Sequence, residues 1–556
     1  MHRSGIVLIL LLLSSPALAV RIVEFCPDPY SPGDPDEYIV LRGIGGLDGI
    51  VVSDGEGGFR FPASCRISGD ITVARNGPAF AETHGYPPDY EWYDYSPAIP
   101  DVIRSGTLQL ANKADQLLLY DHGRLVQEVA WPRDVAARQG QVHYLEEEGW
   151  DPRVLMIGQS RFSTAVFHGV DGVVFVSPDC SLAIYEESVL AAQNELLVNV
   201  YEFSSTRMVQ LLSDARVRGV EVNVLLEGGP VGGISSEEKG AITSLQAAGI
   251  PVLMMASGNA AHPPYRFNHA KYLVIDQSQV FITSENFKSH GFPEAGRSGN
   301  RGWGVVLEDA GLARYFATVY THDATGGWCS EPTFPGGDEE YTWAAQYKVE
   351  FSPYRFSGAT VIPVLSPDTS YLISELIRNA SESVDIEQAY ITNASDGTFN
   401  PYLLESIDAA RRGVSVRILL DSYYYNVDGP EDNDEMVRVL NVLAAREKIP
   451  LEARCADLSG NNLVKIHNKG VVVDKRWALV SSINWNDNSP TFNREAGVII
   501  DHPGVAGHLT RVFEDDWEGS ANQGPQSGPD RLRITLCAVV LAVLAILAYV
   551  RRKRRF

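Results

Sequence analysis

Positively charged residues are under-represented in this chain of 556 residues, which has 46 lysines and arginines against 70 aspartates and glutamates. The formal net charge at pH 7 is therefore −24. Proteins that hold nucleic acid by its phosphates usually present a basic face, so this balance counts against tight, non-specific DNA binding while leaving room for a local basic cleft. With 45% apolar residues the chain can bury several cores, and its length predicts two to four domains.

Charged residues are missing from two apolar runs near the ends of the chain. Residues 1–19 have a basic start, an apolar run from Ile6 to Leu13 and a small-residue site ending at Ala19. This is the layout of a cleavable secretory signal peptide rather than of an uncleaved anchor. Residues 534–550 form the second run, and a helix of that length spans roughly 25 Å, slightly less than the ~30 Å hydrocarbon core of a bilayer. Arg533 and Arg551 can cover the difference, so we predict one transmembrane helix.

The orientation of that helix follows from the five cations at residues 551–555. Because cationic flanks stay on the cytoplasmic side, the tail 551–556 is expected inside the cell and everything before residue 534 outside. Residues 518–533 are rich in Gly, Ser, Gln and Pro and predict a flexible tether. The sequence thus predicts a single-pass protein of the cell membrane with an extracellular main part.

Cysteine is also scarce. The spacings of the six cysteines show no zinc-binding pattern. One lies in the predicted membrane segment, so the exported part has an odd number and at least one thiol should be free or paired between chains. Cys26 with Cys65 is the one disulfide that we predict. The six are Cys26, Cys65, Cys180, Cys329, Cys455 and Cys537.

Residues 20–135 consist of short β-rich runs punctuated by Pro, Gly and Asp, a pattern typical of a β-sandwich. The stretches EFCPDPYSPGDPDEYIVL (24–41) and LLLYDHGRLVQEVAW (117–131) resemble the lamin-tail family. That resemblance implies an all-β immunoglobulin-like domain, followed by a linker over 136–159. It implies little about function.

A pattern of charged and polar residues, H-x-K-x4-D-x7-S-x-N, occurs twice, within residues 267–286 and 465–484. Side chains two apart on a strand share a face, so His and Lys point the same way in each copy, whereas the Asp has the opposite parity and is expected to brace the strand from behind. Ser and Asn follow a second strand and can hold short donors beside the same site. The residues are His269, Lys271, Asp276, Ser284 and Asn286 in the first copy and His467, Lys469, Asp474, Ser482 and Asn484 in the second.

This set of side chains suits a phosphodiester. Two such half-sites facing each other would place the histidines on opposite sides of one phosphorus, with the lysines and asparagines around its non-bridging oxygens. One imidazole can then attack while the other protonates the leaving oxygen. A single H-x-K would suit any surface strand, but two copies extended to Ser and Asn favour a catalytic site. Clustered carboxylates or cysteines are missing from the pattern, so we expect neither metal nor cofactor.

A second internal repeat extends the duplication to the whole region. Each copy of this second repeat is followed by helical and β-rich stretches that end in RGVEVNVLLEG or RGVSVRILLDS. These stretches place Glu227 and Asp421 at the ends of matching strands. We expect structural roles for both residues. We predict two α/β halves, 160–335 and 336–517, each with the order β-α-β-α-β-β-β, packed about a pseudo-twofold axis. The repeated residues are Phe162-Ser163, Phe167, Gly169 and Ser177-Pro178-Asp179, matched by Phe351-Ser352, Phe356, Gly358 and Ser366-Pro367-Asp368.

At the duplicated motif the chain resembles the phospholipase D superfamily, whose mark is a repeated HxKxxxxD followed by small residues and an Asn. The resemblance implies a phosphohistidine intermediate, no metal and one active site between two halves. The family tends to carry a Glu after the motif that orients a histidine; Glu495 supplies it in the second copy, whereas the first has Gly302. We expect Glu495 to orient His467 as general acid. His269, the usual nucleophile by resemblance, is expected to lack such support unless Glu308 or Asp309 replaces the missing partner.

The sequence therefore predicts a membrane-anchored, outward-facing phosphodiesterase of the phospholipase D type. Its substrates would be phospholipids, by hydrolysis or head-group transfer, because the tether confines the site near lipid. An extracellular nuclease with the same chemistry is the alternative, since lamin-tail-like domains also accompany nucleases, and a non-catalytic surface binding protein is a third reading. The oligomeric state is not encoded in any pattern that we find.

Overall fold

The computed structural model describes residues 20–131, 138–146, 149–255, 262–340, 344–429 and 432–520. The predicted signal peptide (1–19) and membrane segment (534–550) lie outside these ranges. Within them, no helix combines the length and the hydropathy needed to cross a bilayer. The described residues divide into two compact units: those within 20–160, 255–265 and 325–330 form the first, and those within 161–254, 266–324 and 331–520 form the second.

The first unit is mostly β, as predicted for residues 20–135, but three strands of the same sheet lie within residues 141–156, where a linker was expected. One sheet has the strand order β11-β10-β1-β2-β5-β6, with β12 also paired to β10, and the other the order β7-β4-β3-β8-β9. Leu41 and Val73 of the first sheet share a buried core with Val52 and Leu119 of the second. The elements are β1 (Arg21–Cys26), β2 (Tyr38–Gly46), β3 (Ile50–Ser53), β4 (Gly58–Arg60), β5 (Arg66–Ala74), α1 (Gly77–His84), β6 (Tyr90–Glu91), β7 (Ile103–Ser105), β8 (Asp115–Asp121), β9 (Arg124–Trp131), β10 (Gln141–Glu146), β11 (Gly149–Trp150), β12 (Leu155–Met156) and β20 (Cys329–Ser330).

The predicted disulfide between Cys26 and Cys65 is wrong. Both thiols are free. Neighbouring residues of β1 face different cores: Phe25 belongs to the larger one and Cys26 to a smaller one. Cys65 packs against the larger core, and its sulfur accepts a hydrogen bond from the Tyr90 hydroxyl at 3.4 Å. The two sulfurs therefore lie against different cores and cannot be bridged.

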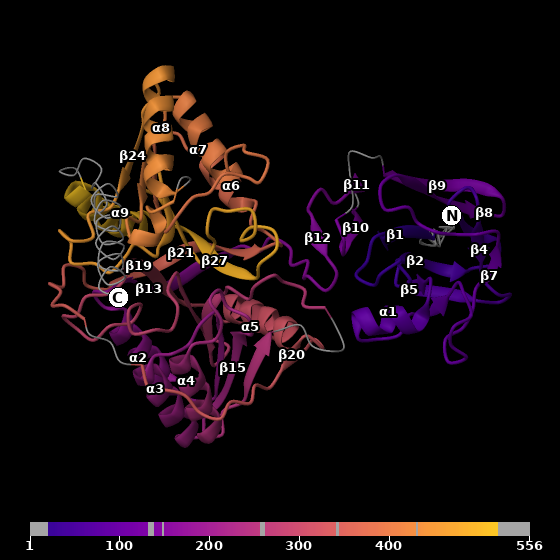
Figure 1. The fold of residues 1–556 in the computed structure, drawn as a ribbon, viewed down its shortest axis with the longest axis horizontal. Helices are drawn as coiled ribbons and strands as arrows, with labels where there is room; N and C mark the ends of the chain where they lie inside the picture. The colour runs from indigo at the N-terminus through magenta and orange to yellow at the C-terminus, as the bar shows by residue number, and fades with distance from the viewer. Residues whose placement is uncertain are drawn as a thin grey trace, which may run out of the picture. The chain divides into compact units, whose positions relative to one another are not determined.

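The second unit contains two halves with the same strand order. Read outward from the centre of one large sheet, the first half runs β13-β19-β18-β17-β14-β15-β16 and the second β21-β27-β26-β25-β22-β23-β24. The central strands β13 and β21 pair antiparallel, which is the arrangement that a pseudo-twofold axis between them requires. In Figure 1 these two strands lie between the helices of the first half and those of the second.

The order within each half is longer than predicted, because each half has two more strands and two more α-helices, one of which closes the half. The first half comprises β13 (Phe167–Ser177), α2 (Ser181–Ala191), β14 (Glu195–Val200), α3 (Thr206–Val217), β15 (Glu221–Glu227), α4 (Ser236–Ala247), β16 (Val252–Met255), β17 (Lys271–Ile275), β18 (Gln279–Thr283), β19 (Gly302–Glu308) and α5 (Ala310–Ala324). The second comprises β21 (Tyr354–Ser366), α6 (Leu372–Arg378), β22 (Ser383–Gln388), α7 (Pro401–Arg411), β23 (Ser415–Leu420), the 3-10 helix η1 (Tyr424–Asn426), α8 (Asn433–Glu447), β24 (Leu451–Cys455), β25 (Lys469–Val473), β26 (Trp477–Ser481), β27 (Glu495–Asp501) and α9 (Pro503–Gly519).

The local sequence explains where these elements begin. Ser205, Ser235 and Asn400 stand at the N-terminal ends of α3, α4 and α7, and each side chain accepts a backbone N–H of the first turn. The strands β17 and β25 are buried along their whole length, including the lysine at the first position of each, and the apolar residues that follow the lysines match this burial. The first residue of each strand, Lys271 or Lys469, lies at the end of the strand that is next to the motif histidine.

Candidate active site

The two motif histidines are held by backbone contacts between the halves. His269 precedes β17, and its N–H donates to the carbonyl of Arg494 in the second half at 2.8 Å. His467 precedes β25, and its N–H donates to the carbonyl of Arg301 in the first half, also at 2.8 Å. The fold thus brings the two copies of the motif, which are almost 200 residues apart in the sequence, into one buried site.

Glu495 contacts His269 and not His467, so the predicted pairing is wrong. Its Oε2 lies 2.8 Å from Nδ1 of His269, within hydrogen-bond distance. The sequence could not reveal this pairing. His467 is nearer to Glu495 in the sequence and lies in the same half, but the carboxylate of Glu495 contacts the histidine of the other half. Glu495 is fully buried, and its carboxylate accepts from Ser482 Oγ at 2.6 Å and from Asn493 Nδ2 at 3.1 Å.

His467 faces a carboxylate that the sequence analysis did not single out. Its Nδ1 lies 3.3 Å from Oε2 of Glu285, a buried residue between the motif residues Ser284 and Asn286. Asn300 donates to the same oxygen at 2.8 Å. Burial raises the pKa of Glu285, and Lys469 is the strongest influence in the opposite direction.

The two lysines lie beside the histidines. Lys271 Nζ donates to the backbone carbonyl of His269 at 2.8 Å, and Lys469 donates to that of His467 at 2.5 Å. Burial lowers the pKa of Lys271 to about 8, with Glu495 opposing. Burial and then Lys271 also lower the pKa of Lys469 well below its ordinary value. An anion bound beside these two amino groups would favour their charged forms.

The electrostatic environments of the histidines differ. Burial lowers the pKa of His269, and Glu495 is the main influence that raises it. Burial, followed by Lys469 and Lys465, lowers the pKa of His467 well below its usual value. Of the two imidazoles, His467 therefore has the stronger preference for the neutral form.

The motif aspartates lie outside the reacting groups and brace neighbouring strands, as their parity indicated. The carboxylate of Asp276 accepts the backbone N–H groups of Gln193, Asn194 and Glu195 at the start of β14. Asp474 does the same for residues 381–383 at the start of β22. Each aspartate thus joins the turn after a motif strand to the strand beside it.

The motif Ser and Asn residues have unequal contacts. Ser284 Oγ accepts the Trp303 N–H at 3.1 Å and Ser482 Oγ accepts the equivalent Ala496 N–H at 3.0 Å, but Ser482 Oγ also donates to Glu495 at 2.6 Å. Asn286 donates through Nδ2 to Glu202 at 2.6 Å. Asn484 is nearly buried. The two half-sites are therefore similar in residue type but differ in hydrogen bonding.

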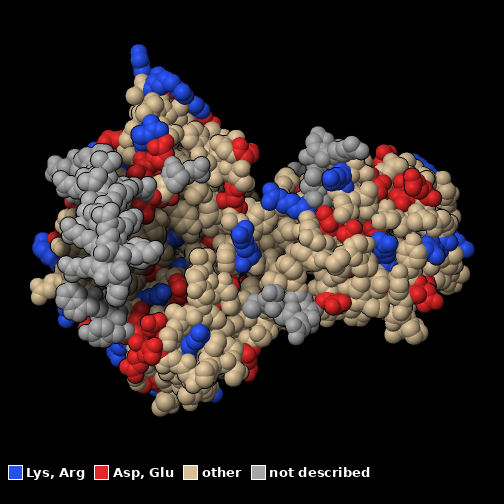
Figure 2. All heavy atoms as spheres, viewed as in Figure 1, with Lys and Arg blue, Asp and Glu red and all other residues tan. Residues whose placement is uncertain are grey.

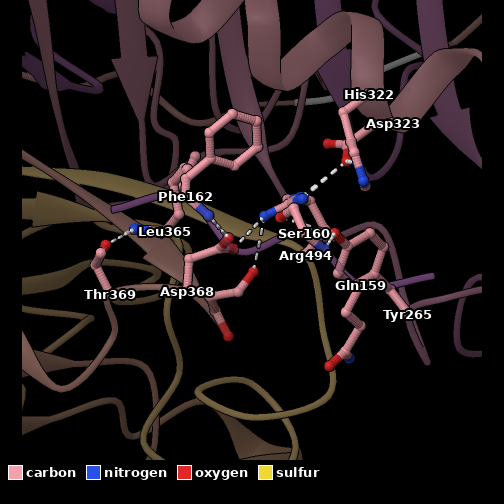
Figure 3. Close-up of polar contacts among 12 residues, drawn as sticks. Gln159, Ser160, Phe162, Tyr265, His322, Asp323, Leu365, Asp368, Thr369 and Arg494 are labelled. Carbon is pink, nitrogen blue, oxygen red and sulfur yellow. Dashed lines mark hydrogen bonds and ion pairs between the residues drawn. The ribbon is translucent and has the colours of Figure 1, made fainter. Parts of the chain in front are cut away.

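Two buried arginines, missed by the sequence analysis, join the halves. Arg494 contacts Asp323 of α5 in the first half and Asp368 of the repeated Ser-Pro-Asp, both at 2.9 Å (Figure 3). Arg301 contacts Asp516 of α9 in the second half at 2.7 Å and Asp179 at 2.9 Å. The NR pairs before β19 and β27, together with the repeated aspartates, are the signal that could have predicted these contacts.

Glu227 and Asp421 have the structural roles that were expected of them. Glu227 accepts the N–H of Asn268, and Asp421 accepts the N–H of Ile466 at 2.7 Å. Each holds the residue that precedes a motif histidine. Burial raises the pKa of Glu227 to about 7 and that of Asp421 to about 6.

The surroundings of the two histidines also differ in polarity. The ring of Tyr201 lies 4.6 Å from that of His269, centroid to centroid. Beside His467 the corresponding feature is a cation, Lys465, whose Nζ lies 2.9 Å from the hydroxyl oxygen of Tyr425. One side of the site is therefore aromatic and the other basic.

Among the described residues, one group of carboxylates is close enough together to hold a metal ion: Glu91, Asp94 and Asp101. It belongs to the first unit. The oxygens of Glu91 already accept backbone N–H groups from Gly77, Tyr95 and Ser96, which is a structural role. At the histidine site, the positive charges of the neighbouring lysines would repel a metal cation.

A duplicated, buried His-Lys site between two α/β halves defines a protein of the phospholipase D-like class. The sequence family described as "Cardiolipin synthase, PLD-like domain" matches residues 186–324 and 373–517, together about half of the chain. The chain belongs to this family. No curated protein sequence matches it.

Solved structures that resemble this chain include proteins from three bacteria. Phosphatidylserine synthase from Haemophilus influenzae Rd KW20 is 13% identical over 69% of this chain and 94% of that chain, with a TM-score of 0.46. The phospholipase D family member Nuc from Salmonella typhimurium is 19% identical over 31% of this chain and 100% of that one, with a TM-score of 0.25. For NucT from Helicobacter pylori the values are 18%, 29%, 98% and 0.24. At these identities and scores the neighbours do not indicate the substrate of this chain.

Proposed function

We propose that this protein is a phosphodiesterase or head-group transferase that acts on phospholipids through a phosphohistidine. The observation that carries the proposal is the pair of buried histidines, each with a carboxylate near Nδ1: Glu495 is hydrogen-bonded to His269 at 2.8 Å, and Glu285 lies 3.3 Å from His467 at ion-pair distance. A carboxylate at Nδ1 fixes the proton there and leaves Nε2 for chemistry. Two such nitrogens with two ammonium groups suit in-line displacement at one phosphorus.

The proposed reaction has two steps. Nε2 of one neutral histidine attacks phosphorus and forms a P–N bond, while the P–O bond to the leaving group breaks and that oxygen takes the Nε2 proton of the other, protonated histidine. The second histidine, now neutral, then removes a proton from water or from an alcohol. The resulting oxygen attacks phosphorus, the P–N bond breaks and the first histidine is restored. Water gives hydrolysis, and an alcohol gives head-group transfer.

A lipid substrate is favoured over nucleic acid by the charge of the chain and by its predicted attachment. In Figure 2 the described Lys and Arg side chains on the visible face are interspersed with Asp and Glu, unlike the continuous basic surface on which nucleic-acid binding usually depends. We propose that residues 534–550 anchor the chain with its main part outside the cell. A tether of about 15 residues would then keep the site close to lipid.

The substrate is tested with the purified full-length protein, in the presence of EDTA, on phospholipid vesicles and on single- and double-stranded DNA. We expect release or exchange of lipid head groups. His269→Ala and His467→Ala should abolish it, and His168→Ala, at an exposed histidine of β13, should not. Cleavage of DNA alone would favour the nuclease, and turnover of neither would favour a binding protein. Loss of activity in EDTA with recovery in Mg²⁺ or Zn²⁺ would contradict a metal-free site.

The membrane orientation is tested separately. Protease added to intact cells is expected to remove the mass before Arg533 and to spare the arginine-rich tail, detected through an epitope fused to Phe556. Protection of the main part would show that the proposed orientation is wrong. This result does not depend on the substrate.

A further inference from the structure

Gly302 occupies a position at which the other half carries a carboxylate. Gly302 is the first residue of β19 and Glu495 the first of β27, and each follows an Asn-Arg pair. Gly302 pairs with Ser177 of β13, whereas Glu495 pairs with Ser366 of β21. The two positions are therefore structurally equivalent. His467 nevertheless has a carboxylate beside it, and this carboxylate belongs to Glu285 of the same half as Gly302.

The side chain of Glu285 fills the space that a side chain at position 302 would need. A Cβ placed on Gly302 would overlap Oε1 of Glu285 and would lie 2.7 Å from its Cγ and 2.7 Å from Ser284 Oγ. The backbone of Gly302 is not in the left-handed region, so its conformation does not require glycine. What excludes a side chain there is the presence of Glu285.

Glu285 shares two features of Glu495: an Asn donor and a position beside a histidine Nδ1. Asn300 donates to Glu285 as Asn493 donates to Glu495, at 2.8 and 3.1 Å. Both glutamates are buried, and each lies beside the Nδ1 of a histidine in the opposite half. In the second copy of the motif the position of Glu285 is Ile483, which is buried in the apolar core. Each half thus contributes one carboxylate, but from different positions.

We propose that Glu285 is the positioning residue of His467 and takes the place of the glutamate missing at position 302. It acts through the imidazole: a carboxylate at Nδ1 fixes the proton on that nitrogen, so that Nε2 faces the phosphorus. The proposal rests on the proposed phosphodiesterase chemistry. Asn300 and the absence of a side chain at Gly302 hold Glu285 in place.

The test moves the carboxylate back. Glu285→Ala should lower kcat about 10- to 100-fold, with a smaller change in KM, because the histidine rather than the substrate loses its support. Glu285→Ala combined with Gly302→Glu should recover most of that loss. Ser284 tolerates such a neighbour, since its counterpart Ser482 donates to Glu495. Gly302→Glu alone should be inactive or unstable, because two side chains would compete for one space.

The matched control is Glu285→Ala with Gly302→Gln, which fills the same space without the charge. Recovery with Glu and not with Gln supports the proposal, and equal recovery with both, or full activity of Glu285→Ala, would overturn it. Glu285→Gln, which keeps the shape, covers the case in which the alanine variant does not fold. Glu308→Gln, at the exposed end of the same strand, should behave as wild type.

The two proposals fail in different ways. A wild-type protein that turns over no phosphodiester contradicts the proposed function, whereas the inference is read from the ratios between variants of an active protein. Its structural part needs no substrate. A crystal structure of Glu285→Ala with Gly302→Glu is expected to place the new carboxylate beside Nδ1 of His467, and a carboxylate directed elsewhere would contradict the exchange.

Discussion

His269 and His467 share a sequence motif but not an environment. His269 has a carboxylate at hydrogen-bond distance, 2.8 Å, and Glu495 opposes the fall of its pKa on burial. Lys469 and Lys465 add to the effect of burial on His467 and hold its pKa well below the ordinary value. A nucleophile must be neutral at the attacking nitrogen, and a general acid must be protonated. We therefore infer that His467 attacks and His269 protonates, the reverse of the roles that the family resemblance implies.

These roles are distinguished with a nitrophenyl phosphodiester, whose leaving group needs little protonation. His269→Ala should retain a burst of nitrophenolate and accumulate phosphoenzyme, because the nucleophile is intact and only the second step lacks its base. His467→Ala should show neither. Stopped-flow absorbance and intact-protein mass spectrometry measure the two quantities. The opposite pattern would restore the roles implied by the resemblance.

The buried Lys271 predicts an alkaline limit on substrate capture. Its pKa is lowered to about 8, so the ammonium is present below that pH and is lost as the pH rises through it. kcat/KM for a phosphodiester should therefore fall above pH about 8. Lys271→Arg keeps the charge at all accessible pH values. It should remove this limb, even if its maximal rate is lower, and a limb that stays in place would exclude Lys271 as its origin.

The sequence predicted the repeated residues but not their partners. His, Lys and Asp recur at fixed spacing within one strand and turn, so local geometry alone predicts which of them share a face. Glu495 and His269 are 226 positions apart, and nothing local indicates that the support crosses between halves. The role of Glu285 could have been predicted from the aligned copies. Glu285 aligns with the apolar Ile483, and the first copy has Gly302 where the second has a glutamate.

At the scale of elements, the turns after β17 and β25 are built in the same way. Asp276 and Asp474 have positive φ angles of 51° and 52°, and each accepts backbone N–H groups from the neighbouring strand. The aspartates therefore fix the register of the strands that follow α2 and α6. They do so from the side opposite to the histidines, so their contribution is to the stability of the sheet.

Asp276→Ala and Asp474→Ala should each lower the free energy of unfolding by about 1–3 kcal/mol, because several backbone donors lose their acceptor. Urea unfolding followed by circular dichroism measures the change. For the folded fraction, kcat should stay within a few-fold of wild type. A loss of kcat as large as that of a histidine variant, without a change in stability, would place the aspartates among the reacting groups instead.

The predicted element order was correct where patterns were long and wrong where they were short. RGVEVNVLLEG and RGVSVRILLDS mark β15 and β23 clearly. The strands β16 and β24 have four and five residues and follow α4 and α8 after short turns. The sequence pattern therefore did not distinguish each helix and its strand from the neighbouring elements. Such short strands are stabilised by pairing with the rest of the sheet, and a local stretch of sequence does not contain that information.

At the scale of the whole second unit, buried ion pairs tie the halves together. Arg301 reaches from the start of β19 to Asp516 of α9, and Arg494 from the start of β27 to Asp323 of α5. These residues are nearly or fully buried. Removing one partner of such a pair leaves a charge without compensation in an apolar setting.

Asp516→Asn should therefore destabilise the protein by about 3–5 kcal/mol. The control is Glu405→Gln, which breaks the exposed pair with Arg378 and should cost less than about 1 kcal/mol. Chemical unfolding of both variants gives the two values. A similar small loss in both would mean that Asp179 alone satisfies Arg301.

The crossing of the supports has a consequence for how the two copies can diverge. Duplication usually leaves one copy free to change, but here each histidine takes its backbone acceptor and its carboxylate from the opposite copy. A substitution of a supporting residue in one half therefore changes the contacts of the imidazole in the other half. For this reason we expect that neither half can lose its supporting residues without affecting both histidines. What can change is the sequence position of the supporting carboxylate within its half, because positions 285 and 302 of the first half share the same space. The glutamate at 285 opposite a glycine at 302 is a change of this permitted kind.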